Sequence, residues 1–424
     1  MATGPATDAP ADRARWRSPV DGGLVLTAVV LLCVAAIVLG WWTKARCLGD
    51  GQWTDGEEYT RWCYTDIHPL WHAERLDERA VPYLDHPVEY PVLTGAVMWV
   101  TARIAYAFPQ ALEQVAFFHA TALLGAGFLL GTLALLVLAG VPPPRLLWFA
   151  AAPTLVVYAF MNWDPPAVFA LVAAIVLHLR GADGAAGVAA GLGTAAKLFP
   201  GFLVPLVAAA RLAQGRREDA LRHVSAAAAA WLVVNVPVAL AAPVGWARFL
   251  QLNRERPADW DSVWFFLQEV RGAVFDVGRL NLVTLLLFVA GGVALVWLGA
   301  RRRDPADWWE LVLPLLAWFL LTNKVYSPQF SLWLLPLFVL VVPRAAPVAA
   351  FAVADLMVFV TRFAFLGGRQ GLEPLASYEV FAAAVLIRAV ILLWIIAVCL
   401  RKRPPLASAA RPPLPLEEVA RRAA

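Results

Sequence analysis

The sequence contains little charge. Asp, Glu, Lys and Arg make up 16% of its 424 residues, whereas an average soluble domain has about 25%. Lysine is especially scarce, because only positions 44, 197, 324 and 402 carry it, and the formal net charge is only +4. This composition excludes a basic nucleic-acid-binding module and a highly charged disordered chain. A hydrophobic content of 61% also excludes a typical soluble enzyme.

Several chemical motifs are also missing. No glycine-rich loop of the kind that cradles phosphates is present, so we expect no nucleotide as a partner. The composition already excludes a nucleic acid. His68 and His72 stand one helical turn apart, but no His-Glu-x-x-His pattern accompanies them. We therefore expect no metal and no cofactor. The pair Gly191-x-Gly193 is typical of close helix packing.

Long apolar runs are what the sequence has in abundance. Its mean hydropathy is +0.65, and a membrane-spanning helix needs about 20 apolar residues. The runs predict an all-α, polytopic transmembrane helix bundle of about 12 spans, with one further run forming a re-entrant or interfacial helix. They lie near 23–42, 91–108, 115–140, 146–160, 165–180, 184–198, 200–212, 224–242, 281–300, 309–322, 328–343, 347–365 and 379–400.

Basic linkers predict the orientation of the bundle. Arginines cluster at 211–222 and 301–303, and the positive-inside rule places such linkers in the cytoplasm. The loops 43–90 and 243–280 are then outside, with both termini in the cytoplasm of a bacterium and the chain in its plasma membrane. The predicted divisions are a cytoplasmic tail at 1–22, a transmembrane domain at 23–400 and a disordered, basic cytoplasmic tail at 401–424.

The four cysteines fall into two groups. Cys33 and Cys399 lie within apolar runs and are expected to be inert core residues. Cys47 and Cys63 share the first outer loop. If this loop faces an oxidising compartment, the two are expected to form a disulfide.

The same loop carries the first candidate for catalysis. It has ten acidic and five basic residues between 43 and 90. Asp66 stands within Tyr64-Thr65-Asp66-Ile67, where a carboxylate at the membrane surface can act as a general base. The alternative is that Asp66 caps a short helix beginning at Ile67. Glu89 is predicted to have a structural or substrate-hydroxyl-binding role.

Three polar turns interrupt the later apolar runs. One contains Asn162 and Asp164, the second Lys197, and the third Lys324 to Gln329. Ionisable groups within a membrane are costly and need partners, so they indicate a functional site. Asp164 or a lipid phosphate is the natural partner of Lys197. Turn formation and snorkelling of the lysines remain the alternatives.

The order of these motifs resembles a known family. Tyr64-x-Asp66-Ile67, Val81-Pro82-Tyr83 and Val88-Glu89-Tyr90-Pro91, followed by the three polar turns, are similar to motifs of the GT-C membrane glycosyltransferases. Within that superfamily the resemblance is to glycosyltransferase family 87 and its actinobacterial relatives. It implies Asp66 as the catalytic base. The residues expected to bind substrate are Glu89, Tyr90, Asn162, Asp164, Lys197, Lys324, Tyr326 and Gln329.

The resemblance also implies a function. We expect an inverting hexosyltransferase that moves a sugar, mannose by analogy, from a polyprenyl-phosphate donor at the outer membrane face. The acceptor is expected to be a glycolipid or a cell-envelope glycan, and membrane lipids are further partners. Two alternatives stay open: a transporter or flippase of lipid-linked sugars, and a non-catalytic partner in envelope assembly. Under the enzyme hypothesis, Asp66, Asn162, Asp164, Lys197, Lys324 and Gln329 converge on one cavity.

Overall fold

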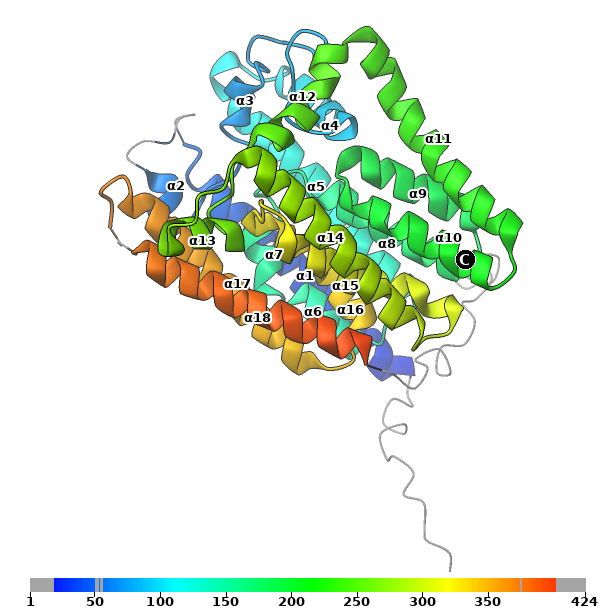
Figure 1. Ribbon diagram of the computed structural model, residues 1–424. Helices are drawn as coiled ribbons and strands as arrows, with labels where there is room; N and C mark the ends of the chain where they lie inside the picture. Colours follow the sequence, from blue (N-terminus) through cyan, green and yellow to red (C-terminus); the bar gives the residue numbers. More distant parts are fainter. Residues whose placement is uncertain (1–18, 50–52, 54–55, 374–375, 402–424) are drawn as a thin grey trace, which may run out of the picture.

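The computed structural model describes residues 19–49, 53, 56–373 and 376–401, without the side chains of 19–22. The regular structure of this part is helical apart from one isolated β-bridge between Pro82 and His86 (Figure 1). Most of the two expected tails, 1–22 and 401–424, lies outside the described residues. The first helix begins at Pro19.

The first half of the described chain forms α1 (Pro19–Ala45), α2 (Glu57–Thr60), α3 (Leu70–Ala73), α4 (Val92–Ala105), η2 (Gln110–Leu112), α5 (Glu113–Leu138), α6 (Pro143–Ala150), α7 (Pro153–Tyr158), α8 (Pro165–Leu179), α9 (Asp183–Ala196), η3 (Phe199–Phe202) and α10 (Leu203–Ala213). The second half forms α11 (Arg217–Ala241), α12 (Pro243–Glu255), α13 (Val263–Arg271), α14 (Val277–Ala300), η4 (Pro305–Leu311), α15 (Val312–Thr322), η5 (Pro328–Phe330), α16 (Ser331–Val341), α17 (Ala345–Gly368) and α18 (Tyr378–Leu400).

Six helices of the described chain are long and apolar enough to cross a membrane. They are α1, α5 together with η2, α11, α14, α17 and α18. The outward faces of these helices are apolar; on α11, for example, Val233 and Leu240 are 74% and 80% exposed. Large apolar side chains on the outside are stable in lipid and would promote aggregation in water. The chain is therefore an all-α, multi-pass membrane protein, as the composition predicts.

The expected number of about 12 spans is not supported by the helix lengths. Several neighbouring apolar runs form pairs of helices that are each too short for a full span, with a break in the α-helix between them: α7 and α8, α9 and α10, and α15 and α16. Proline begins the later helix or the 3-10 turn leading into it at Pro165 and Pro328, where its missing N–H costs nothing. Such irregular backbone is tolerated at membrane depth where protein surrounds it.

The loop expected at 243–280 is itself largely helical. It contains α12 and α13, and α14 begins at Val277. In Figure 1, α2, α3, α12 and α13 lie toward one end of the bundle, away from the C-terminal end of α18. The turns at 159–164 and 323–327 contact the segments next to these helices, because the Asp66 N–H donates to the Met161 carbonyl and the Asp259 N–H donates to the Lys324 carbonyl, each at 2.8 Å.

Close helix packing fixes the position of α9. A Cβ atom at Gly187 or Gly191 would lie 2.2 Å from a backbone carbonyl oxygen of α11, that of His223 or of Ala227. Glycines four residues apart let two helix backbones approach in this way. Because Lys197 follows directly after α9, this packing also sets the position of that lysine.

Replacing Gly191 with Ala is expected to destabilise the protein, because the new methyl group overlaps the Ala227 carbonyl. Overpacking of this kind costs about 1–3 kcal/mol. Thermal unfolding of the detergent-purified protein measures the effect. Gly184→Ala is the matched control on the same helix, since its Cβ would meet only flexible Arg222 atoms at 3.4 Å. Equal unfolding temperatures for the two variants would contradict this role of Gly191.

Candidate active site

Two hydrogen bonds bring the first loop to the turn between α7 and α8. The Thr65 hydroxyl donates to the Phe160 carbonyl at 2.7 Å, and the Asp66 N–H donates to the Met161 carbonyl at 2.8 Å. This pairing places the Asp66 side chain beside Asn162. Asp66 stays partly exposed, whereas Asn162 is buried.

Three donors hold the Asp66 carboxylate. The Tyr64 hydroxyl donates to Oδ1 at 2.7 Å, and the Asn162 amide donates to Oδ2 at 2.7 Å. The Gln329 amide approaches Oδ2 at 3.4 Å. The alternative that Asp66 caps a helix is wrong, because α3 begins only at Leu70 and the carboxylate bonds side chains from distant segments.

Asn162 links Asp66 to a buried cation. Its Nδ2 donates to Asp66 and to the Tyr90 hydroxyl at 2.8 Å. Its Oδ1 accepts from the Lys197 ammonium at 3.1 Å and from the backbone N–H of Trp163 at 2.7 Å. Because both donors and both acceptor positions of the amide are used, its orientation is fixed.

Lys197 is paired within the protein and does not snorkel to the surface. It is 8% exposed, and its Nζ lies 3.3 Å from Oδ1 of Asp164, which is fully buried. The same Asp164 oxygen accepts from the Trp333 indole at 2.6 Å. The ring centroid of Tyr90 lies 5.0 Å from the ammonium, a cation–π distance.

Burial changes the pKa values of the two carboxyl groups in this region, those of Asp66 and Glu89. It raises the pKa of Asp66 above its usual range, although hydrogen bonds from Tyr64 and Asn162 and the charge of Lys197 oppose the shift. Burial, together with the charge of Asp66, also raises the pKa of Glu89. A carboxylate with a raised pKa is a better proton acceptor near neutral pH.

The buried carboxyl group of Glu74 holds the backbone of Glu89. The Glu89 N–H donates to Oε1 of Glu74 at 3.3 Å, and Oε2 of Glu74 lies 3.5 Å from Nε2 of His86. Glu74 is 3% exposed, and burial raises its pKa from 4.5 to about 7. The ionisation of Glu74 therefore affects the backbone that carries Glu89 and Tyr90.

Glu74 is expected to make stability depend on pH. Since its folded pKa is raised, the folded state binds the proton more tightly, and the free energy of unfolding falls as pH rises from about 4.5 to about 7. Glu74→Gln removes this loss while keeping an acceptor for the Glu89 N–H. At pH 8 the variant should be more stable than the wild type by roughly 1–3 kcal/mol.

Thermal unfolding at pH 5 and pH 8 measures this difference. Glu78→Gln is the matched control, because Glu78 is an exposed residue of the same loop paired with Arg75. If stability falls between pH 5 and pH 8 as much in Glu74→Gln as in the wild type, Glu74 is not the group that makes stability depend on pH.

Two residues expected at the site have other contacts. The Lys324 ammonium bonds the backbone carbonyls of Arg254 and Arg256 at 3.4 and 2.5 Å, so it caps the C-terminal end of α12. Tyr326 is buried, with its hydroxyl 3.3 Å from that of Ser331 and its ring 3.8 Å below the Arg388 guanidinium. The structure therefore brings neither side chain to the carboxylate of Asp66.

Sequence reasoning missed two parts of this region. It assigned no role to Tyr64, although a tyrosine two residues from a candidate base is within bonding reach. It also overlooked the buried pair of Asp355 and Arg388, whose closest atoms are 3.3 Å apart. Asp355 and Arg388 each interrupt an apolar run, which is the signal that could have revealed this pair. Asp355 also accepts from the hydroxyl of Ser331, two residues after Gln329, and so steadies that segment.

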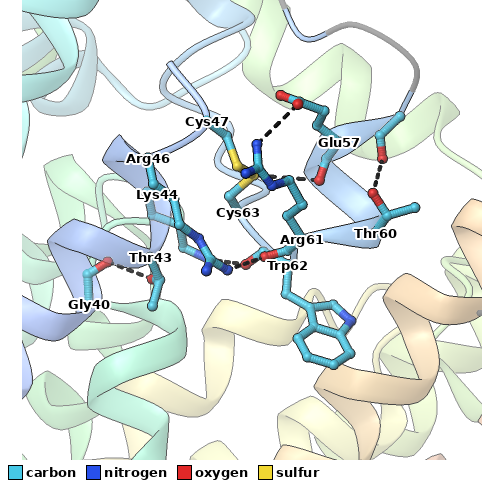
Figure 2. Close-up of a disulfide and its surroundings, with 11 residues drawn as sticks. Gly40, Thr43, Lys44, Arg46, Cys47, Glu57, Thr60, Arg61, Trp62 and Cys63 are labelled. Atoms are coloured by element: carbon cyan, nitrogen blue, oxygen red, sulfur yellow. Dashed lines mark hydrogen bonds and ion pairs between the residues drawn. A yellow bond between two sulfur atoms is a disulfide. The ribbon is translucent and has the colours of Figure 1, made fainter. Parts of the chain in front are cut away.

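A disulfide closes the start of the first loop (Figure 2). It joins Cys47 to Cys63, with Cα atoms 6.3 Å apart. Beside it, Lys44 approaches the Trp62 carbonyl at 3.5 Å, and Arg46 bonds the carbonyl of Arg61. The end of α1 is thereby tied to the segment that carries Asp66.

The described residues contain no group of three His, Cys, Asp or Glu side chains placed to hold a metal ion. His72 instead lies 2.7 Å from Asp77.

No family model and no curated protein sequence matches the chain, so membership of glycosyltransferase family 87 is not confirmed. Solved structures similar to the chain include two of ArnT from Cupriavidus metallidurans. The apo form has 18% identity and a TM-score of 0.45, over 90% of this chain and 78% of ArnT. The form bound to undecaprenyl phosphate has 17% identity and a TM-score of 0.43, over 88% and 76%.

Proposed function

We propose that this protein is an inverting membrane glycosyltransferase that uses a polyprenyl-phosphate sugar as its donor. The observation that carries the proposal is the bonded chain from Asp66 through Asn162 to Lys197. In this chain a single amide, that of Asn162, connects the partly exposed carboxylate of Asp66, whose pKa is raised, to the buried ammonium of Lys197. A proton acceptor beside a cation suits a substrate with a nucleophilic hydroxyl on one side and an anionic leaving group on the other.

In the proposed reaction, an acceptor hydroxyl loses its proton to Asp66. Its oxygen forms a bond to the anomeric carbon, while the bond from that carbon to the phosphate oxygen breaks and polyprenyl phosphate leaves with the electron pair. Lys197 stabilises the charge that develops on the phosphate. Burial raises the pKa of Tyr90 well above its usual value, so this hydroxyl stays neutral and can donate.

The membrane setting favours a lipid-linked donor. The carboxylate lies next to the turn between α7 and α8, while the long helices present apolar outer faces to lipid. A donor held in the bilayer by its prenyl chain can reach such a site sideways. Mannose is our expected sugar, from the family resemblance, and the acceptor is a glycolipid or envelope glycan.

The disulfide supports an extracytoplasmic site. Disulfides persist in oxidising compartments, and Cys47 and Cys63 flank the segment leading to Asp66. We therefore place the first loop outside the bacterial plasma membrane and the arginine-rich turns at 211–222 and 301–303 inside.

The test is an assay of the full chain in lipid nanodiscs with polyprenyl-phosphate mannose and a set of lipid and glycan acceptors. We expect a mannosylated product of inverted anomeric configuration, released with polyprenyl phosphate. Movement of the donor across a liposome membrane without any product would instead establish a transporter. If neither a product nor movement of the donor is observed, the non-catalytic role in envelope assembly is favoured.

A further inference from the structure

An aromatic cluster lies next to Oδ1 of Asp66. We define it as Trp53, Tyr59, Tyr64 and Phe363. The ring centroid of Tyr64 is 5.7 Å from that of Trp53, 6.2 Å from that of Tyr59 and 5.5 Å from that of Phe363. Tyr64 is also the residue whose hydroxyl holds Oδ1 of Asp66. The cluster and the carboxylate are therefore in direct contact.

Trp53 occupies the position in this cluster nearest to the loop that follows Asp66. Its ring also lies 5.1 Å from that of His68, so it contacts rings two residues before and two residues after Asp66. Trp53 is partly buried, and its indole nitrogen is shielded from solvent with no hydrogen-bond partner among the described residues. A buried N–H without a partner costs about 1–3 kcal/mol, so a ligand that displaces the groups shielding this nitrogen and accepts its bond gains affinity.

A sugar ring satisfies both features of Trp53. One face of a hexopyranose carries C–H groups that can lie on an indole ring, and its hydroxyl oxygens can accept from the indole N–H. Tryptophan suits such ligands because it combines a large apolar surface with one polar group. An aliphatic alcohol could use the ring but offers one oxygen only.

The two oxygens of Asp66 face different surroundings. Oδ2 bonds Asn162 and Gln329, and Asn162 continues to Lys197, the proposed phosphate partner. Oδ1 bonds Tyr64 and so faces the aromatic cluster. In an inverting reaction the nucleophile and the leaving group occupy opposite faces of the transferred sugar. If the phosphate lies toward Lys197, the attacking hydroxyl comes from the side of the cluster.

We infer that the aromatic cluster is the acceptor subsite and that the acceptor presents a hexopyranose ring, which stacks on Trp53 while one of its hydroxyls meets Asp66. The inference rests on the proposed function, because that function defines which side the leaving group occupies. It specifies which part of the glycolipid or glycan acceptor is recognised, a hexopyranose ring, and which residues recognise it.

The first test measures sugar binding without requiring turnover. The full chain in nanodiscs is titrated with n-octyl hexopyranosides, and saturation-transfer NMR reports which sugar protons contact the protein. We expect a signal from the sugar ring in the wild type that is lost in Trp53→Ala and weakened in Trp53→Phe, which keeps a ring but lacks the N–H. Trp62→Ala is the matched control, because Trp62 lies in the same loop and is 38% exposed. Equal ring signals in all variants overturn the inference.

The second test separates the acceptor from the donor. With the polyprenyl-phosphate sugar as donor and an octyl hexopyranoside as acceptor, Trp53→Ala should raise the KM for the acceptor about tenfold or more, equivalent to about 1.4 kcal/mol. The KM for the donor should be unchanged. A raised donor KM with an unchanged acceptor KM would overturn the assignment. Absence of transfer by the wild type would count against the proposed function alone, since the binding test still decides whether a sugar stacks on Trp53.

Discussion

Replacing Asp66 with Asn is expected to lower kcat for sugar transfer by about 10²–10⁴-fold, the usual contribution of a general base. Asn keeps the size of the side chain and an oxygen that accepts from Tyr64 or Asn162, so folding should be intact. It cannot take a proton from the acceptor hydroxyl. The measurement is product formation in nanodiscs, alongside thermal unfolding of the same preparation.

The pH dependence of the wild type provides a second reading of the same residue. The base must be ionised to act, so kcat/KM should fall as pH decreases through the pKa of Asp66. Because burial raises that pKa, the fall should begin at a higher pH than for an ordinary aspartate. The residual kcat/KM of Asp66→Asn should not show this fall at acidic pH.

Two control variants make the result specific. Asp77→Asn removes an aspartate of the same loop whose partner is His72 on a half-exposed surface, and it should leave the rate unchanged. Glu89→Gln tests the neighbouring carboxylate, and a smaller loss than in Asp66→Asn is expected. Full activity in Asp66→Asn, or a larger loss in Glu89→Gln, would show that Asp66 is not the base.

The sequence predicts the helix bundle well, for a physical reason. Long uncharged runs are stable only as helices in lipid or in a protein core, and six of them form long apolar helices. The number of crossings is not predictable in the same way. Run length does not reveal which runs become full-length spans, and the runs on either side of the breaks at 159–164, at Lys197 and at 323–327 form shorter helices.

The site illustrates the same limit for side chains. A buried charge in an apolar run predicts that a partner exists, and Lys197 has Asp164 as its partner. The identity of the partner depends on tertiary packing. Lys324 interrupts an apolar region in the same manner, but its partner is the C-terminal end of α12, which ends 69 positions earlier in the sequence at Glu255. No local pattern distinguishes these two lysines.

The buried pair of Lys197 and Asp164 allows stability and catalysis to be separated. Replacing Lys197 with Met leaves Asp164 buried and uncompensated, which typically costs about 3–5 kcal/mol. Asp164→Asn alone should also destabilise, because it removes the charge that balances the ammonium. The double variant removes both charges and keeps an amide oxygen for the Trp333 indole, so thermal stability should recover to near the wild-type value.

Activity should behave differently from stability in this series. If Lys197 stabilises the leaving phosphate, transfer by the double variant stays low although the protein is stable again, because no cation remains within one amide of Asp66. If the pair serves only the fold, activity returns together with stability. Measuring the unfolding temperature and kcat on each of the four proteins decides between these outcomes, and recovery of both in the double variant would remove Lys197 from the proposed mechanism.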